Sequence, residues 1–545
     1  MTTRATTPQE TACDVLVIGG GLVGLAAGAF LAQHGVDVTV VERHPSTSLH
    51  PKARLVTVRS MELYSSLGID DEIRTAGEPN GGFAVAADLS AEHDQWVPPA
   101  DDESAAAHLS PFTPYSCDQQ RIEPILRTRA EELGARVLFG TQASDISEGE
   151  HEVSARLDRN GTVSTLRARY LLAADGARST IRRNLGIGLD GEPVPGTAVS
   201  ALFSADLSPA LHGRVVDALM ARNAEAFLFA RGNESERQWQ LGTHQRPEWS
   251  NGTDLSTQLA SIIRAATGLP ELDPHIDSVL TWSTGAYVAQ RLSAGRIFLL
   301  GDAAHQMPPY GGFGGNTGVQ DAHNLAWKLA AVCRGEADSR LLDSYEIERG
   351  PLVRLIVEQA LLRSRKTPGQ PAPPEQIDSA TLSLGSAYPP ISDTAAKADS
   401  AIDALTSAVE DPRDPSGRPG TRAPHIALST SSRSTLGILD PVRFTFIADD
   451  RSPTAAALSE RPPAALAIRT VAPGSAAAEH RQVWDRIYSG SDCDGVLVRP
   501  DHVIAWRAPK GLADPVSAVS SALATALGHG PQWRKPHDQA SGRVT

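Results

Sequence analysis

Residues 13–42 restrict the fold more than any other stretch, because they join a glycine loop to two short apolar runs. Asp14–Ile18 has the pattern of a buried strand, and Gly19–Gly24 follows it directly as G-x-G-x-x-G. A helix is predicted at Leu25–His34 and a second strand at Val36–Val41. A strand, a glycine loop, a helix and a second strand in this order predict a Rossmann-like domain with a parallel sheet.

Each glycine of this loop has its own physical role at a dinucleotide site. Gly19 permits the tight turn, Gly21 lets a pyrophosphate approach the backbone, and Gly24 lets helix and strand pack closely. Glu42 lies 18 residues beyond Gly24, where a carboxylate would accept hydrogen bonds from ribose hydroxyls. An acid there suits adenosine with a free 2′-hydroxyl, so we predict FAD or NAD rather than NADP, with Arg43 also among the cofactor-binding residues.

A second glycine-rich stretch lies far downstream, at residues 301–328. It follows Ile297–Leu300, an apolar run with the pattern of a buried parallel strand. A helix is predicted from Gly318 to Arg334. Backbone N–H groups can approach a ligand closely here, since glycine lacks Cβ and a helix N-terminus carries partial positive charge. Five glycines fall within eight residues of this stretch: Gly311, Gly312, Gly314, Gly315 and Gly318.

Two dipeptides that each join an aspartate to a glycine, Gly301-Asp302 and Asp175-Gly176, accompany the glycine loops. Asp302 comes directly after the downstream strand and could accept hydrogen bonds from sugar hydroxyls, although a surface aspartate in a tight turn is the alternative. The apolar run Tyr170–Ala174 ends in Asp175 and a glycine, a common turn sequence, and Arg178 nearby could neutralise a phosphate. The order of these motifs along the chain favours one shared cofactor site.

The downstream stretch resembles the flavin-dependent aromatic hydroxylases of the p-hydroxybenzoate hydroxylase and phenol hydroxylase type. The resemblance implies FAD as cofactor and NADPH or NADH as a transient co-substrate. It also implies that O₂ forms a C4a-hydroperoxyflavin, which transfers oxygen to an electron-rich aromatic ring. The patterns GD, PPxGGxGxNxG and DxxNLxWK match without a gap at Gly301, Asp302, Pro308, Pro309, Gly311, Gly312, Gly314, Asn316, Gly318, Asp321, Asn324, Leu325, Trp327 and Lys328.

The resemblance assigns roles to the residues of this loop. Pro308, Pro309 and Gly311 would form the wall at the flavin face toward the substrate, and no obligatory acid or base is assigned. The residues that would place N–H donors beside the flavin pyrimidine are Gly312, Gly314, Gly315 and Asn316. His305, Tyr310 and His323 lie near this motif in sequence, and His305 could equally be a packed structural histidine.

Two further segments resemble the family's FAD-contacting segments. Lys52 stands where the family has an arginine near the flavin, so the charge is kept and the planar guanidinium is not. Gln119 takes the place of a glutamine that contacts FAD, the alternative being an ordinary polar residue at a helix N-terminus. Arg59 and Glu62 also match the family, but at a spacing of three they could form a plain surface ion pair.

The chain is too long for a single core, so several domains are expected, in an α/β fold. We predict a Rossmann-like FAD domain, an interleaved β-sheet domain for the substrate, and a thioredoxin-like C-terminal domain. The last resembles that of the longer hydroxylases acting on aromatic polyketides, through SGRPGTRAPH and DGVLVRPDHVIAWR. The predicted ranges are 1–80, 110–190 and 285–365 for FAD, 81–109 and 191–284 for the sheet, 366–415 for a linker, 416–530 for the C-terminal domain, and 531–545 for a disordered tail.

The residues that define the substrate should lie in the sheet domain. Four aromatic residues are candidates for lining the site, and each could equally be part of a core: Phe227, Phe229, Trp239 and Trp282. The C-terminal region has no CxxC pair, so a structural or dimerising role is expected there rather than thiol redox chemistry.

Composition excludes several other functions. A net charge of −14 argues against a nucleic acid or an anionic membrane as partner. No metal-ligand spacing is present, and four widely spaced cysteines fit free thiols in a reducing compartment. The polar N-terminus lacks the apolar run of a signal peptide, so we expect a cytoplasmic protein. The expected oligomeric state is a monomer or a homodimer.

The leading prediction is an FAD-dependent, NAD(P)H-consuming monooxygenase that hydroxylates an aromatic small molecule, and the expected substrate is a polycyclic polyketide. One alternative keeps the cofactor but inserts oxygen beside a ketone or rearranges a ring, as in Baeyer–Villiger chemistry. A second alternative is a flavin-binding protein without catalytic turnover.

Overall fold

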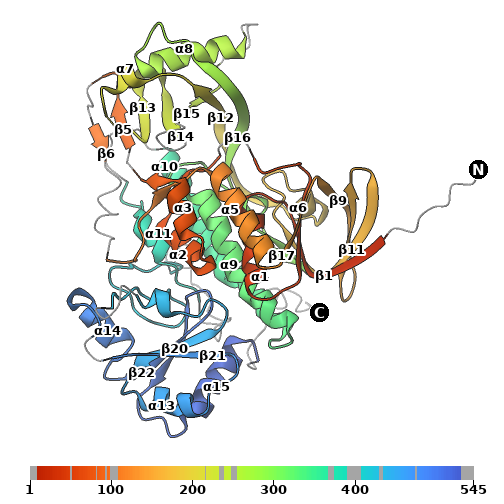
Figure 1. Ribbon diagram of the computed structural model, residues 1–545, viewed down its shortest axis with the longest axis vertical. Coiled ribbons are helices and arrows are strands. Elements are labelled where there is room, and N and C mark those ends of the chain that lie inside the picture. The colour runs from red at the N-terminus through yellow and green to blue at the C-terminus, as the bar shows by residue number, and fades with distance from the viewer. Residues whose placement is uncertain are drawn as a thin grey trace, which may run out of the picture.

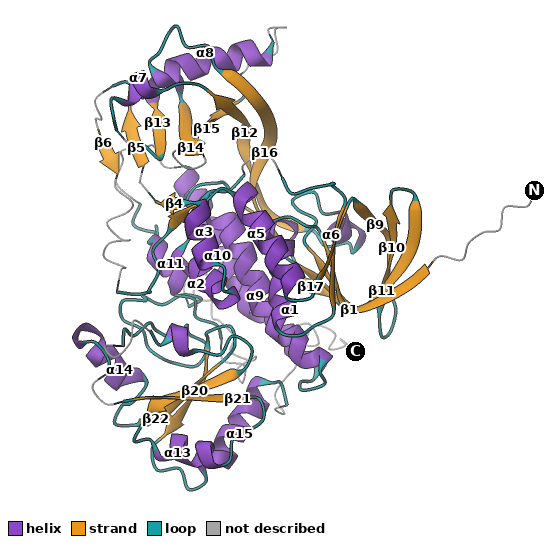
Figure 2. Ribbon diagram, in the orientation of Figure 1, coloured by secondary structure: helices purple, strands orange, loops and turns teal. Residues whose placement is uncertain are grey.

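The computed structural model is an α/β protein in three parts (Figures 1 and 2). A sheet-rich part lies at the top of the view, a central part contains the glycine motifs, and the C-terminal part lies below. The predicted disordered tail at 531–545 is outside the described residues. The described residues are 9–48, 52–80, 83–91, 95–97, 108–214, 216–231, 238–246, 249, 254–365, 373–389, 407–428, 434–472 and 475–529.

The central part is built on an eight-stranded sheet whose main path runs β17-β18-β11-β1-β2-β8. Strand β1 pairs in parallel with both β2 and β11, which confirms the predicted Rossmann-like arrangement. The strands are β1 (Gln9–Ile18), β2 (Val38–Glu42), β8 (Arg136–Phe139), β9 (Thr141–Glu148), β10 (Val153–Arg159), β11 (Thr162–Ala173), β17 (Ser293–Ala294) and β18 (Ile297–Leu299).

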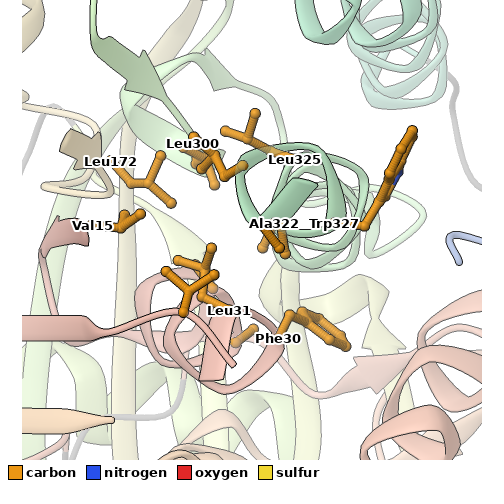
Figure 3. Close-up of a cluster of buried hydrophobic side chains, with 14 of the residues drawn as sticks. Val15, Phe30, Leu31, Leu172, Leu300, Ala322, Leu325 and Trp327 are labelled. Carbon is orange, nitrogen blue, oxygen red and sulfur yellow. The ribbon is translucent and has the colours of Figure 1, made fainter. Parts of the chain in front are cut away.

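Two helices from distant parts of the chain pack on this sheet and on each other. Helix α1 (Leu22–Gln33) follows the first glycine loop, and α9 (Phe313–Cys333) follows the second. Figure 3 shows side chains of both helices meeting those of the strands, with Ala322 facing Phe30 and Leu31, and Leu325 beside Leu300. This shared core fixes the two glycine loops relative to each other.

Helix α9 begins at Phe313, five residues before the predicted start at Gly318. The sequence-based prediction placed Gly314, Gly315 and Asn316 in a loop because glycine has a low helix propensity. In the structure these residues form the first turn, since burial of this end against α1 and its neighbours outweighs the propensity. The helix N-terminus therefore lies within the glycine motif itself.

The upper part is a second eight-stranded sheet, ordered β19-β16-β12-β15-β14-β13-β5-β6, with α8 (Leu255–Thr267) over one face (Figure 1). It is interleaved with the first domain, as predicted. Strand β19 (His305–Gln306) belongs to the Asp302 segment, so this sheet is joined directly to the glycine-rich stretch. The other strands are β5 (Phe83–Ala86), β6 (Gln95–Val97), β12 (Leu189–Ser204), β13 (Ala218–Ala221), β14 (Ala226–Arg231), β15 (Gln238–His244) and β16 (His275–Ala289).

The C-terminal part has the predicted thioredoxin-like topology. Its sheet runs β21-β20-β22-β23, with β20 and β21 parallel and β22 antiparallel to both β20 and β23. The elements are β20 (Phe444–Asp449), α13 (Pro453–Glu460), β21 (Leu466–Val471), α14 (Arg481–Ile487), β22 (Cys493–Val498), β23 (Ile504–Pro509) and α15 (Pro515–Ala526).

Shorter elements connect these parts. Helix α11 (Ser379–Leu384) lies inside the predicted linker and contacts α2. Within the described residues, no helix is both long enough and apolar enough to cross a bilayer. The remaining helices and strands are α2 (Val58–Leu67), α3 (Asp70–Ala76), α5 (Gln119–Glu132), α6 (Thr180–Asn184), α7 (Ser208–Leu211), α10 (Ser344–Ser364), β3 (Leu55–Val56), β4 (Glu78–Pro79) and β7 (Tyr115–Ser116), with short 3₁₀ turns η1 (Arg222–Ala224), η4 (Gly301–Ala303), η5 (Ser339–Asp343), η6 (Leu436–Ile438) and η7 (Ala478–His480).

Arg59 and Glu62 are buried where α2 meets the C-terminal domain, so the surface ion pair considered from the sequence is wrong. Arg59 Nη1 lies 2.8 Å from Glu62 Oε2, and Arg422 of the C-terminal part also binds this carboxylate. Burial opposes ionisation of Glu62, but the two guanidinium groups outweigh it and lower its pKa to about 2. Burial lowers the pKa of His502, at the same contact, to about 3.

These buried groups predict a loss of stability in acid. Between pH 6.5 and about 3 the unfolded chain protonates His502 while the folded chain does not, so the free energy of unfolding decreases as pH falls. The contribution is about 1.4 kcal/mol per pH unit within that window. Glu62 adds to the loss as pH falls from 4.5 towards 2. Urea denaturation from pH 7.5 to 5 should show a flatter pH dependence for His502→Gly, whereas His151→Ala, at an exposed histidine, should match the wild type.

Candidate active site

The first glycine loop touches the end of the strand that carries the Asp-Gly motif. A Cβ on Gly19 would lie 2.2 Å from the carbonyl oxygen of Ala174, and Gly19 has φ +110°. A Cβ on Gly24 would lie 1.8 Å from the carbonyl oxygen of Gly19. Both positions therefore require glycine, and Asp175 follows directly beside the loop.

The second glycine loop is pressed against the first. A Cβ on Gly318 would lie 2.4 Å from Val23 Cγ2 and 3.1 Å from the Cα of Gly301. A Cβ on Gly315 would lie 2.9 Å from Leu22 Cδ2. The two glycine motifs and the two acidic dipeptides, which are far apart in sequence, thus meet in one region, as the sequence analysis expected.

The loop before α9 turns sharply at two glycines. Gly311 and Gly312 have φ +88° and +66°, and the N–H of Gly312 donates to the carbonyl of Pro309 at 3.2 Å. Pro308 is buried, whereas Pro309 and Gly311 are exposed. The first four N–H groups of a helix have no acceptor inside it, so α9 begins with donors that face the region where the motifs meet.

Asn316 shapes this loop through its side chain. Its Nδ2 donates to the carbonyls of Gly312 at 2.7 Å and Leu55 at 2.8 Å, and its Oδ1 accepts from the N–H of Thr57 at 3.1 Å. The amide is therefore engaged by the chain on both ends. It fixes the start of α9 to strand β3 and to the N-terminus of α2.

Asp175 has one oxygen in use and one without a partner. Its Oδ2 accepts from the N–H groups of Thr180 at 2.9 Å and Ile181 at 3.3 Å, at the start of α6. Its Oδ1 is buried and has no hydrogen-bond partner within the described chain. Arg178 is exposed. Arg182, which the sequence analysis missed, is buried and donates to the carbonyl of Ala303 at 3.0 Å, joining the two acidic motifs.

The protein around Asp302 shifts the pKa of its carboxyl group. Its side chain is exposed, yet surrounding protein disfavours its charged form and raises the pKa, an effect that His305 and Lys52 partly offset. Lys52 also partly offsets the rise in pKa that burial causes at Glu123 of α5. Lys52, which stands at the place of the family's arginine, thus lies near the carboxylates of Asp302 and Glu123.

Glu42 accepts hydrogen bonds at the end of β2, where a ribose-binding acid was predicted. The N–H groups of Gly20 and His44 donate to it at 2.7 and 2.9 Å. Burial opposes its ionisation, but these donors outweigh burial and lower its pKa, so it is an anion at neutral pH. Arg43 beside it is exposed.

Glu123 is a site residue that the sequence analysis did not select. It is buried, and its Oε1 would be the nearest atom, at 3.7 Å, to a Cβ on Gly21. Gln119 Nε2 donates to it at 2.7 Å, and the N–H of Ser48 donates at 3.0 Å. Gln119 therefore reaches the first glycine loop through this carboxylate.

An aromatic wall, comprising Phe83, Phe227, Phe229 and Tyr310, lies between the second sheet and the glycine-rich loop. Phe227 is the centre, with ring centroids 6.0 Å from Phe83, 6.1 Å from Phe229 and 6.4 Å from Tyr310. Gly242 pairs with Phe227 in the sheet and has no side chain to fill that face. Tyr310 brings the loop itself into the wall.

The register of the sheet places the other two candidate lining residues, Trp239 and Trp282, on opposite faces. Trp239 is buried in the core on the opposite face, beneath α8. Trp282 is 39% exposed and pairs with Ala198 of β12. Ala198 lies on the same face of β12 as Ser200, the residue that pairs with Gly242. Trp282 and the neighbouring Leu280, 36% exposed, thus extend the apolar face that carries the aromatic wall.

The two histidines near the motif are structural. His305 is buried with Nε2 2.7 Å from Asp321 Oδ2, and the same carboxylate accepts from the N–H of Gly301 at 3.2 Å. His323 is buried with its ring against Phe30 and His502. Across the described ranges, no three His, Cys, Asp or Glu side chains gather as ligands for a metal.

Comparison with known families agrees with this geometry. Residues 12–360 match the FAD binding domain family, and residues 416–530 match the C-terminal domain of aromatic-ring hydroxylases. The chain belongs to the FAD-binding aromatic-ring hydroxylases. Among relatives of this family, 4-methyl-5-nitrocatechol 5-monooxygenase of Burkholderia sp is 37% identical, covering 97% of this chain and 100% of that protein.

Relatives named for tetracenomycin and aklavinone are similar over comparable lengths. Tetracenomycin A2 monooxygenase-dioxygenase of Streptomyces glaucescens is 34% identical over 93% of this chain and 96% of that protein. The crystal structure of aklavinone-11 hydroxylase with FAD and aklavinone is 30% identical with a TM-score of 0.82, covering 95% of this chain and 99% of that chain. These aromatic-ring hydroxylases share both the glycine-motif domain and the C-terminal domain with this chain.

The residues present fit an FAD. Asp175 Oδ1 is a buried acceptor without a partner within the described chain, and Asp302 is exposed while the surrounding protein raises its pKa. Gly21 leaves space at the N-terminus of α1, where a pyrophosphate is favoured by the helix dipole. The start of α9 at Gly312, Gly314 and Gly315 would serve the flavin ring.

A methyl group on Gly318 should separate the two glycine loops. Gly318→Ala improves the helix propensity of α9, but its Cβ must displace Val23 and the backbone of Gly301. We expect FAD affinity to fall at least tenfold, measured by flavin fluorescence titration, with a lower melting temperature.

Gly350→Ala is the matched control. Gly350 lies in α10, and nothing is within 4 Å of its Cβ position, so this variant should bind FAD normally and be equally or slightly more stable. Equal FAD affinities for the two variants would contradict the close contact of the loops.

Proposed function

We propose that this aromatic-ring hydroxylase is an FAD-dependent monooxygenase that uses NADH or NADPH and O₂ to hydroxylate a polycyclic aromatic metabolite of polyketide type, through a C4a-hydroperoxyflavin. The observation that carries the proposal is the aromatic wall, because it faces the glycine-rich loop rather than the sheet core. Relatives named for tetracenomycin, aklavinone and a nitrocatechol support an aromatic substrate.

FAD supplies the electron transfer and oxygen activation when it is bound. The chain supplies position and environment. The donors at the start of α9 would stabilise negative charge on the flavin pyrimidine, and Pro308 and Pro309 would hold the loop rigid at the flavin face. Phe227 and Tyr310 would exclude water from the space above, which limits loss of the activated oxygen as hydrogen peroxide.

A buried ionic cluster fixes the position of the aromatic wall relative to the glycine-rich loop. Arg54 of the central domain donates to Asp217 of the sheet domain at 2.9 Å and to Asp118 at 3.3 Å. Arg231, the residue two beyond Phe229, donates to Asp118 at 2.6 Å. These charges link both domains beside the wall.

The same cluster informs the class of substrate. Both guanidinium groups already have carboxylate partners, and Arg54 also binds Glu78 at 2.5 Å. Arg231 additionally donates to Gln240. Although Arg231 Nε has no partner among the described residues, both cations are already neutralised by buried carboxylates, which favours a neutral or phenolic ring system over a carboxylic acid.

The test is substrate-stimulated oxidation of NADH and NADPH. Purified protein reconstituted with FAD should show the flavin visible spectrum and should oxidise NADH or NADPH faster when a polycyclic phenol such as a hydroxyanthraquinone is added. The product should gain one oxygen atom on the ring by mass spectrometry and NMR. A lactone or rearranged ring would indicate the Baeyer–Villiger alternative, and an FAD complex that no aromatic compound stimulates would indicate the flavin-binding alternative.

Adjacent residues of β14 provide a paired test of the wall. Phe227→Leu removes an aromatic contact of about 0.5–1.5 kcal/mol, so KM for the aromatic substrate should rise roughly two- to twelvefold. Leu228→Val changes the opposite, core-facing position and should lower stability by about 1 kcal/mol without changing KM. If Leu228→Val raised KM as much as Phe227→Leu, the assignment of the two sheet faces would be wrong.

A further inference from the structure

We propose that the turn Arg499–Val503 of the C-terminal domain, here termed the docking turn, positions the glycine loop at the start of α9. The thioredoxin-like domain would thereby support the cofactor site without taking part in the chemistry. The inference rests on the proposed function only in taking that loop as part of the FAD site. Three separate contacts of the docking turn carry it.

The first contact is ionic and holds the middle of α9. Arg499 binds Glu348 of α10 with Nη1–Oε1 at 2.5 Å and Nη2–Oε2 at 2.9 Å. Glu348 in turn accepts from Lys328 Nζ and from Asn324 Nδ2, each at 2.7 Å, and both of these residues lie on α9. All four side chains are buried. The docking turn is thus tied to α9 through fully desolvated charges.

The second contact leads to the glycine loop by hydrogen bonds. Arg59 in the first turn of α2 donates to His502 Nδ1 at 3.1 Å and to the carbonyl of Asp501 at 2.9 Å. The N-cap of that helix is Thr57, whose N–H donates to Asn316. Asn316 then binds the carbonyl of Gly312, the N-cap of α9. The C-terminal domain therefore holds the helix that fixes the loop.

The third contact is apolar and lies directly beneath the loop. Val503 belongs to the same buried cluster as Phe313, the first residue of α9, together with Leu352 and Tyr388. The ring of Phe313 would be 2.3 Å from a Cβ on Gly311. Removing the docking turn would take Val503 out of the buried cluster to which Phe313 belongs, beside the turn of the loop.

The backbone conformation of His502 in the docking turn indicates a specific role for its side chain. His502 has φ +66°, in the left-handed region that glycine and asparagine adopt more readily than histidine. A histidine occupies this position in spite of the unfavourable conformation, and its ring contacts Arg59 and His323. Such an outlier points to a role for the ring rather than for the turn alone.

The experiment compares His502→Gly with His502→Asn. Glycine suits the left-handed backbone but removes the acceptor for Arg59, whereas asparagine tolerates the backbone and restores an acceptor. We expect His502→Gly to weaken FAD binding about tenfold and to accelerate amide exchange in residues 308–320 of the apoprotein. His502→Asn should recover most of both properties, and Arg443→Ala, at an exposed ion pair of the same domain, should match the wild type.

The readouts separate this inference from the proposed function. A lower melting temperature for His502→Gly with unchanged exchange at 308–320 would show a purely structural contact and would overturn the inference. Wild-type FAD affinity in His502→Gly would also overturn it. Failure of the wild-type protein itself to bind FAD would instead refute the proposed function, and the exchange comparison in the apoprotein would still decide whether the docking turn positions the loop.

Discussion

The contact between the N-terminal ends of α1 and α9 is the interaction on which the rest of the structure depends. It brings Gly318 against Val23 and Gly301 so closely that a single methyl group would not fit. Two helix N-termini, each with unsatisfied N–H groups and partial positive charge, are thereby placed side by side. An arrangement of that kind favours a long ligand with negative charge at more than one place, as a flavin dinucleotide has.

Buried charges hold the three parts of the molecule around this contact. Arg54 links the sheet domain to the central domain, and Arg499 and Arg422 link the C-terminal domain. Buried ion pairs add little net stability, because desolvation offsets much of the attraction, but breaking one leaves an uncompensated charge. They therefore penalise any other arrangement of the domains. The aromatic wall and the glycine loop are thereby held in fixed positions, and Arg231 also contacts the wall, since its guanidinium lies over the ring of Phe229 at 5.5 Å.

Local patterns in the sequence were enough to predict the strand–loop–helix–strand unit and both glycine motifs, whereas the thioredoxin-like topology was predicted from the resemblance to the longer aromatic hydroxylases. The start of α9 was wrong because Gly314 and Gly315 have low helix propensity, and only packing against α1 places them in the helix. Glu123 was missed because its proximity to Gly21 arises from tertiary structure. Phe227 and Trp239 could not be separated, since an alternating pattern does not show which face α8 covers.

The structure of the protein crystallised with FAD tests the account most directly. We predict one FAD per chain, with its ribose at Glu42, its pyrophosphate at the N-terminus of α1, and its ring between the start of α9 and the aromatic wall. A flavin bound outside the space shared by Gly21, Asp175 and Gly314, or two flavins in separate sites, would contradict the central claim that these motifs form a single cofactor site.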